Sequence, residues 1–176
     1  MNFVKIIIVI ALSLASTVTL CAAASDQATA TDIFLSRVFT DAIPPSNMLW
    51  VSGERKTAVA EILRHQPEYL RLRYWGNAQR SAWIVDEIGK TEPITFGIVI
   101  HNNQIESVEV LVFRESRGWE IQHDFFSRQF TDAKLLDNKR LDRPIDGISG
   151  ATLSVKAMQN VSRMVLYLTG SLPREL

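Results

Sequence analysis

A segment near the end of the chain combines hydroxyl groups with very small neighbours. Residues 146–152 have the sequence Asp-Gly-Ile-Ser-Gly-Ala-Thr. Gly150 and Ala151 leave little bulk beside the Thr152 hydroxyl, so another molecule can approach the backbone there. The residues that follow predict a helix, and at a helix N-terminus the unpaired N–H groups and the positive end of the dipole favour a phosphate. The segment therefore predicts a site where a hydroxyl and a phosphate could meet.

The helix predicted after this segment spans residues 153–168. Its apolar residues recur at helical spacing, whereas Lys156, Asn160 and Arg163 fall on another face. The apolar positions are Val155, Met158, Val161, Val165 and Leu168. Gly170 and Pro173 are typical of a helix stop, so the helix should end close to them.

Two other interpretations of the same segment need no phosphate. Ser149, Thr152 and Ser154 could be ordinary caps after a glycine-containing turn. Residues 147–151 also come close to the G-x-S-x-G elbow of a serine hydrolase, with Ser149 as its nucleophile. Ala151 replaces the last glycine of that elbow, however, and residues 141–145 are not the buried apolar strand that the elbow requires. Asp146 and Gly147 also suit an Asx-type turn.

A second motif lies upstream of the first. Glu115-Ser116-Arg117-Gly118 is followed by Trp119, then by Phe125 and Phe126, and then by the pair Gln129-Phe130. Taken alone, the charged residues favour a solvated turn. Trp119 suits either a packed core or the wall of a ligand site, because an indole ring offers a large flat surface.

Taken together and in this order, the two motifs resemble those of the FMN-binding domain family. That family has a flavinylation motif of Asp, two variable residues, Ser or Thr, and then Gly-Ala-Thr. Its other motif is a Glu-Thr-Pro-Gly-like loop followed by a Phe and a Gln-Phe pair. The resemblance covers roughly residues 80–168. In this chain Ser116 and Arg117 replace the commoner Thr-Pro, which puts the contacts of these two positions in doubt.

The resemblance implies a covalent cofactor and a set of residues around it. FMN would be joined to Thr152 by a phosphoester bond that a flavin transferase makes. The cofactor-binding residues implied by the first motif are Asp146, Gly147, Ser149, Gly150, Ala151 and Thr152, of which Asp146 would act in recognition or activation during attachment. Those implied by the second motif, in a loop beside the flavin, are Glu115, Ser116, Gly118 and Trp119.

The composition and the N-terminal residues indicate where in the cell the protein is expected to function. The chain has 176 residues, a formal net charge of +0 and 22% charged residues, which suits one globular domain with some extra length. Lys5, the apolar run 6–20 and Ala22-Ala23-Ala24 predict a secretory signal peptide over residues 1–24, with an uncleaved membrane anchor as the alternative. Cys21 is the only cysteine and would leave with the signal, so the mature chain would have no disulfide and no c-type haem attachment.

The family resemblance, taken with the predicted signal peptide, implies a periplasmic electron-transfer flavoprotein. NAD(P)H is not available outside the cytoplasm, so a relay to or from a membrane or periplasmic redox protein suits an exported chain better than a nicotinamide dehydrogenase does. No basic stripe is visible, which argues against a nucleic-acid partner. Two alternatives stay open: a noncovalent flavin-binding or sensing module, and a periplasmic adaptor protein that does not use the cofactor for redox chemistry.

The predicted fold class is α+β, with an antiparallel sheet flanked by helices. Alternating apolar residues predict strands over 70–75, 81–85, 94–100 and 105–114, and Asn102-Asn103 predicts a tight hairpin turn between the last two. Helices are predicted over 32–42, 54–65 and 124–130, with a linker over 25–31. The domains would be a signal peptide over 1–24, an N-terminal helical segment with the first strand over 25–75, and the FMN-binding domain over 76–170.

The remaining aromatic and titratable residues are predicted to be structural. Trp50, Trp75, Trp83 and Trp119 favour a core over a binding platform. Asp86 and Glu87 are expected on the surface at a strand end. His65, His101 and His123 lack the spacing of a metal site and are expected at the surface or at caps.

Overall fold

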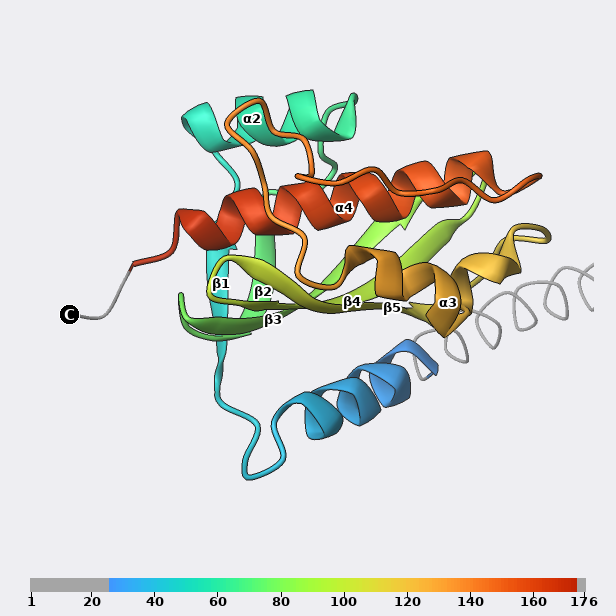
Figure 1. Cartoon of the computed structure of the whole chain (residues 1–176). Helices are drawn as coiled ribbons and strands as arrows, with labels where there is room; N and C mark the ends of the chain where they lie inside the picture. Colours follow the sequence, from blue (N-terminus) through green and yellow to red (C-terminus); the bar gives the residue numbers. More distant parts are fainter. Residues whose placement is uncertain (1–25, 174–176) are drawn as a thin grey trace, which may run out of the picture.

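The protein is built on one five-stranded antiparallel sheet with helices on both faces (Figure 1). The computed structural model describes residues 26–173, so the predicted signal peptide lies outside the described residues. The strands follow chain order across the sheet: β1 (Ser46–Trp50), β2 (Arg71–Gly76), β3 (Arg80–Ile88), β4 (Pro93–His101) and β5 (Gln104–Val112). The predicted α+β class is thereby confirmed.

The helices and short turns surround this sheet. They are a helix over residues 26–38, α2 (Gly53–Leu63), η1 (Trp119–Gln122), α3 (Asp124–Ser127), η2 (Arg128–Phe130) and α4 (Thr152–Gly170). The helix 26–38 covers one face of the sheet, while α4 crosses the other face with α2 above it (Figure 1). No helix in the described part of the chain is long and apolar enough to cross a membrane.

The hairpin of β4 and β5 forms where the sequence predicts it. Asn102 and Asn103 have φ of 51° and 61°, the left-handed pair that a tight hairpin turn requires and that asparagine tolerates. All seven residues of 94–100 are buried, because β4 is covered on both faces. The hairpin therefore places the residues after β5 at the end of a rigid, central part of the sheet.

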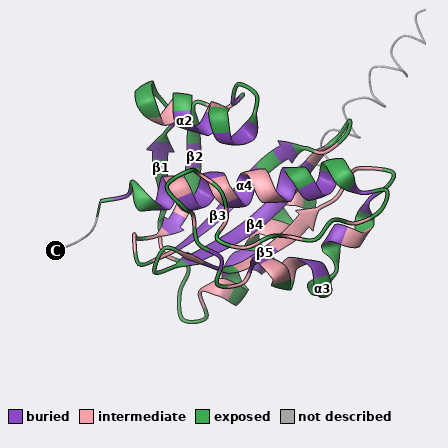
Figure 2. Ribbon diagram, turned by 45° about the horizontal axis from the view of Figure 1, so that its top comes forward, coloured by how far each residue is buried: buried purple, intermediate pink, exposed green. Residues whose placement is uncertain are grey.

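The main core lies between the sheet and α4. The face of the sheet that carries Trp83, Phe96 and Ile98 packs against the predicted apolar face of α4, which includes Met158 and Val161. Figure 2 shows buried residues along β3, β4 and α4. A smaller cluster on the opposite face comprises Phe34, Leu35, Trp75, Ala82 and Val99. The helix bearing Thr152 is thus fixed to the sheet along much of its length.

The N-terminal part differs from the prediction in two respects. Residues 26–31 are helical rather than a linker, and the helix ends at residue 38 rather than 42. The Gln27 side chain bonds to the Asp86 carboxylate and accepts a hydrogen bond from Arg114, so these polar residues attach the helix to the sheet. Strand β1 was not predicted, because only Leu49 of its five residues is buried and it forms an edge of the sheet.

The prediction that all four tryptophans belong to the core is wrong for two of them. Trp75 and Trp83 are buried, but Trp50 and Trp119 are 56% and 54% exposed. Trp50 lies on the edge strand β1, beside the guanidinium of Arg71. Trp119 begins η1, directly after the second sequence motif. An exposed indole at that place bears on the site described next.

Candidate functional site

Thr152 is the first residue of α4, and its side chain is exposed. The N-cap residue is Ala151, which has no side-chain acceptor. Within residues 26–173, the Thr152 hydroxyl makes no hydrogen bond, and neither do those of Ser149 and Ser154. The interpretation of these hydroxyls as helix caps is therefore wrong. Gly150, with φ of 85°, forms the turn that delivers Thr152 to the surface.

The loop of the second motif packs directly against the start of α4. Gly118 has φ of 87°, and a Cβ atom placed on it would lie 2.9 Å from Ser154 Oγ and 3.3 Å from Ala151 Cβ. Only glycine allows this approach, because any side chain would both strain the backbone and collide with α4. The loop after β5 and the first turn of α4 lie at the same, right-hand end of the molecule in Figure 1. The two motifs thus lie next to each other in the structure.

The pair Gln129-Phe130 provides a second link between the motifs. The Phe130 ring is buried and meets Phe126 edge to face at 5.8 Å. This anchor places Gln129 so that its Oε1 accepts a hydrogen bond of 2.7 Å from the Asp146 backbone N–H. Asp146 and Gly147 are otherwise exposed, and no atom outside the neighbouring residues lies within 4 Å of a Cβ built on Gly147. Gln129 therefore holds the first residue of the first motif.

Replacing Gln129 with leucine is expected to release this end of the motif. The Asp146 N–H would lose its acceptor, at a cost of about 1 kcal/mol. We expect faster hydrogen exchange of the Asp146 amide, measured by NMR, with little change in the amides of β4. Gln129→Glu keeps an acceptor oxygen and is the matched control. Unchanged exchange of the Asp146 amide in the leucine variant would contradict the role assigned to Gln129.

Glu115 supports the loop rather than facing outward. Its carboxylate accepts hydrogen bonds from the backbone N–H of Lys90, from Thr91 N at 2.7 Å and from Glu92 N at 3.0 Å. The Thr91 hydroxyl donates to it as well, at 3.2 Å. These bonds, above all the one from Glu92, hold the pKa of Glu115 below its usual range. Glu115 therefore ties the turn between β3 and β4 to the loop that contacts α4.

Glu115→Gln is expected to lower the free energy of unfolding by about 1–2 kcal/mol at neutral pH. A lowered pKa means that the carboxylate stabilises the fold fully above its ordinary pKa, and that this contribution is lost as pH falls through the lowered value. The difference in free energy of unfolding between wild type and variant, measured by urea unfolding, should therefore become smaller below about pH 4. Glu92→Gln, an exposed change in the same turn, is the control. A difference that grows on acidification would contradict this assignment.

Exposed aromatic rings continue from the loop. Trp119 meets the His123 ring at 5.0 Å, edge to face, and His123 stacks on Phe125 at 5.8 Å. Trp119 and Phe125 are 54% and 61% exposed. The intervening Ile121 and the following Phe126 point into the core and fix this segment. The sequence analysis did not predict a role for His123 beside Trp119. Its position four residues after Trp119 could have indicated that the two rings lie close together.

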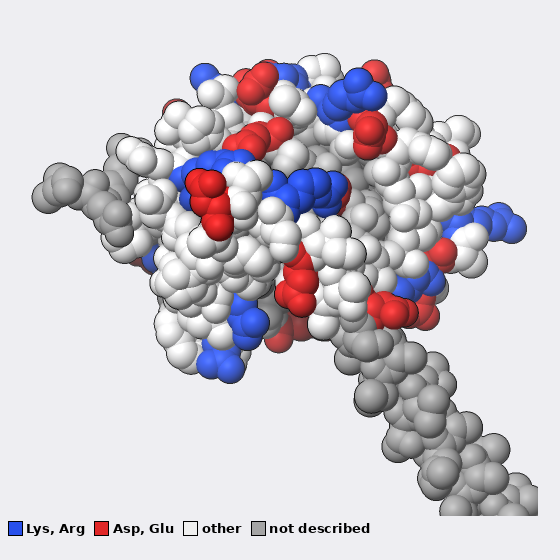
Figure 3. Space-filling model, turned by 90° about the horizontal axis from the view of Figure 1, so that it is seen from below, with Lys and Arg blue, Asp and Glu red and all other residues white. Residues whose placement is uncertain are grey.

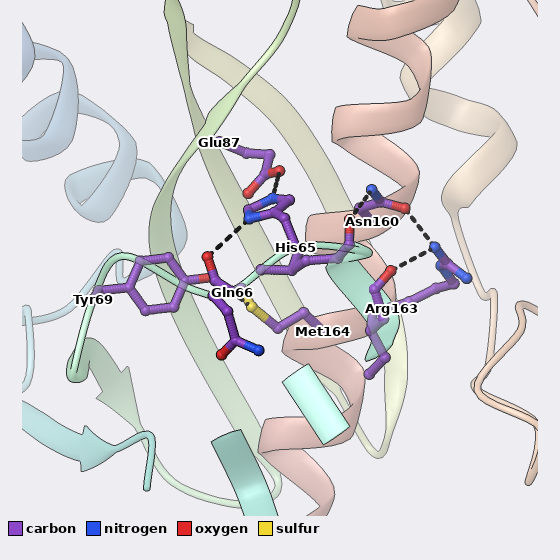
Figure 4. Close-up of polar contacts among 9 residues, drawn as sticks. His65, Gln66, Tyr69, Glu87, Asn160, Arg163 and Met164 are labelled. Atoms are coloured by element: carbon purple, nitrogen blue, oxygen red, sulfur yellow. Dashed lines mark hydrogen bonds and ion pairs between the residues drawn. The ribbon is translucent and has the colours of Figure 1, made fainter. Parts of the chain in front are cut away.

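A concavity is lined by residues that follow α2 and by residues of β3 and β4, among them His65, Gln66, Tyr69 and Glu87 (Figure 4). It has a volume of about 420 Å³ and is lined by residues 65–66, 68–69, 86–88 and 93. Glu87 lies at its floor and is only 6% exposed, which corrects the expectation of a surface residue; its Oε1 is 2.6 Å from His65 Nε2. Burial raises the pKa of Glu87, and the hydrogen bond to Glu87 raises that of His65. Among the described residues, no three of His, Cys, Asp and Glu are grouped as a metal site.

Polar residues of α4 explain how α2 ends beside this concavity. Asn160 donates from its side-chain amide to the Leu63 carbonyl at 3.2 Å, and Arg163 donates to the Ile62 carbonyl at 3.0 Å (Figure 4). They satisfy carbonyls that the last turn of a helix leaves unpaired. The polar face of α4 is therefore occupied by contacts with α2, which lie away from the N-terminal end of α4.

The family comparison agrees with the geometry. Residues 89–166 match the model of the FMN-binding domain. This part of the chain is an FMN-binding domain. The match begins in the turn held by Glu115 and ends within α4, so it includes both motifs and the hairpin. No curated protein matches the chain. The family predicted from the motifs is confirmed for these residues, and the match supports flavin binding.

The residues of the site fit a phosphate-bearing flavin. An exposed hydroxyl stands at the start of a 19-residue helix, with no acidic residue in its first turn. No atom outside the neighbouring residues lies within 4 Å of a Cβ built on Gly150, so the backbone there is open to a ligand. Glu120 Oε2 is a buried acceptor without a hydrogen bond among the described residues, and it lies beside Trp119 in η1. The site thus offers room, donors, a flat aromatic surface and a free acceptor.

Proposed function

We propose that Thr152 carries FMN through a phosphoester bond and that the protein transfers electrons outside the cytoplasm. The observation that supports this most directly is the exposed, unbonded Thr152 hydroxyl at the start of α4, whose first turn meets Gly118 of the second motif through Ala151 and Ser154. When bound, FMN supplies one- or two-electron redox chemistry. The chain's own residues supply attachment, position and surroundings.

In the proposed attachment, Thr152 Oγ1 forms a new bond to phosphorus. The bond from phosphorus to the leaving group of a flavin dinucleotide breaks, and the hydroxyl proton leaves with that nucleotide or passes to a base of the flavin transferase. Gly150 and Ala151 present no bulk to either molecule. The backbone N–H groups of the first turn of α4 remain free to donate to the phosphate.

Trp119 is the proposed wall for the ring system. Its indole is exposed yet held by the buried residues of η1 and α3, and it is braced by His123. A flat aromatic surface of this kind favours offset stacking with another ring. The adjacent Phe125 would extend the apolar surface toward a membrane or periplasmic redox protein, whose electron transfer needs only a small and transient interface.

The test is expression of the full chain together with a flavin transferase, followed by intact mass and peptide mapping. We expect the mass to increase by one FMN less one water, and the modified peptide to contain Thr152. Yellow colour that is lost on denaturation would support the noncovalent alternative instead. A chain that stays unmodified under these conditions would contradict covalent attachment. Protease protection of the chain in intact cells would test its location.

A further inference from the structure

We propose that Arg117 and Lys156 bind the phosphate attached to Thr152. This inference rests on the proposed function and concerns how that site holds its anion. Arg117 is one of the two positions at which this chain departs from the family's commoner loop sequence. A loop proline offers no charge, whereas a guanidinium can donate two parallel hydrogen bonds to phosphate oxygens. The departure therefore adds a specific function to the loop.

The Arg117 side chain has no partner among the described residues, a property that it shares with Arg73 on β2, but only Arg117 lies in the loop that contacts α4. Three other arginines form ion pairs with carboxylates, among them Arg37–Glu109 at 3.0 Å and Arg80–Glu106 at 2.7 Å. Figure 3 shows positive and negative side chains next to one another over the face seen from below. Arg117 is exposed, and no ion pair or hydrogen bond connects its side chain to any other described residue. A free guanidinium at this place is available to an anion.

The backbone places Arg117 beside the attachment hydroxyl. Its neighbour Gly118 touches the first turn of α4, at Ala151 and Ser154. These two residues flank Thr152 along the helix, so the loop that carries Arg117 lies against the turn that carries the hydroxyl. An arginine side chain is long enough to reach across this contact.

Lys156 approaches from the other direction. It lies four residues after Thr152 in α4, and residues four apart share one face with Cβ atoms about 5–6 Å apart. Lys156 is exposed and has no ion-pair partner in the part of the chain that the structure describes. The loop cation and the helix cation thus both belong to segments that adjoin the same hydroxyl.

The local charges favour one anion here. A phosphate diester carries a single negative charge at neutral pH, and neither Arg117 nor Lys156 is already neutralised by an ion pair among the described residues. The nearby Glu115 carboxylate is occupied by the N–H groups of the neighbouring turn. Asp146 is the exposed acid of the first motif and would oppose binding, which gives a reason for two cations rather than one. Both interactions are solvent-exposed, so each should have a moderate effect.

The experiment compares FMN with riboflavin, which lacks the phosphate, on the full chain expressed without a flavin transferase. Quenching of tryptophan fluorescence reports binding of each ligand. We expect wild type to bind FMN more tightly than riboflavin, and Arg117→Gln and Lys156→Gln each to lower this ratio by about three- to tenfold. Arg117→Lys should retain part of the preference. Arg73→Gln removes an equally exposed and unpaired charge from β2 and should leave the ratio unchanged.

Two outcomes would overturn the inference. One is a wild type without preference for FMN over riboflavin, whether both ligands bind or neither does. The other is an Arg117→Gln variant whose ratio equals that of Arg73→Gln. The mass measurement on coexpressed protein is independent of these ratios. A preserved FMN preference without covalent modification would contradict the proposed attachment but still support binding of the FMN phosphate by Arg117 and Lys156. Modification with unchanged ratios would contradict this inference alone.

Discussion

A chain with valine in place of Thr152 is expected to carry no covalent flavin after coexpression with a flavin transferase. Valine has nearly the shape of threonine but lacks the oxygen that would bond to phosphorus. Because Thr152 is exposed and makes no hydrogen bond within residues 26–173, we expect a change in the free energy of unfolding within about 0.5 kcal/mol. In-gel fluorescence of the denatured protein and intact mass should both show that the covalently bound flavin is absent.

Two matched variants separate the hydroxyl from its surroundings. Thr152→Ser keeps the oxygen and should retain flavin, at a reduced rate of attachment. Ser149→Ala removes the neighbouring exposed hydroxyl of the same motif and should leave the modified residue unchanged. Flavin retained in the valine variant, or a modified peptide that maps to Ser149, would refute attachment at Thr152.

Gly118→Val is the substitution in the second motif with the largest expected effect. The backbone at Gly118 has φ of 87°, which β-branched residues avoid, and the new Cβ would lie 2.9 Å from Ser154 Oγ. Strain and collision together should lower the free energy of unfolding by about 2–4 kcal/mol. If the loop moves away from α4 instead, stability is spared but flavin attachment should fall sharply. Urea unfolding and attachment yield, measured together, distinguish these responses.

Gly147→Ala is the matched control for this change. It adds a Cβ atom to a glycine of the first motif, but no atom outside the neighbouring residues lies within 4 Å of that position, and its φ is not positive. We expect a change in stability within about 0.5 kcal/mol. A Gly118 variant as stable and as well modified as the Gly147 variant would show that the loop does not need to touch the helix.

The parts of the fold that the sequence predicted are those with strong local signals. The hairpin of β4 and β5 follows from alternating apolar residues around Asn102-Asn103, whose backbone takes the expected left-handed form. Helix α4 follows from its apolar face, and the predicted range 153–168 lies within the observed Thr152–Gly170. In both cases the burial pattern within one segment was sufficient, because the element is central and covered.

The features that were missed depend on contacts between distant segments. Nothing local in β1 indicates a strand, because its pairing with β2 defines it. Glu87 was expected at the surface because its burial depends on His65, from the residues after α2. The role of Glu115 was missed for a similar reason, since its partners are backbone N–H groups of another turn. In the candidate site, the motifs indicated which residues to consider, but the partner of each side chain could not be predicted.

The fixed position of α4 has a consequence for how the proposed cofactor would exchange electrons with a redox partner. The helix is packed against the sheet along its length and bonded to the end of α2, so its exposed tip cannot swing. Reorientation of a flavin fixed there would be limited to rotation about the few single bonds between the threonine and the ring. The distance between the flavin and the partner's redox centre would then be set by how the whole molecule docks. A surface substitution near the N-terminus of α4 should therefore alter the association rate and not the range of positions open to the flavin.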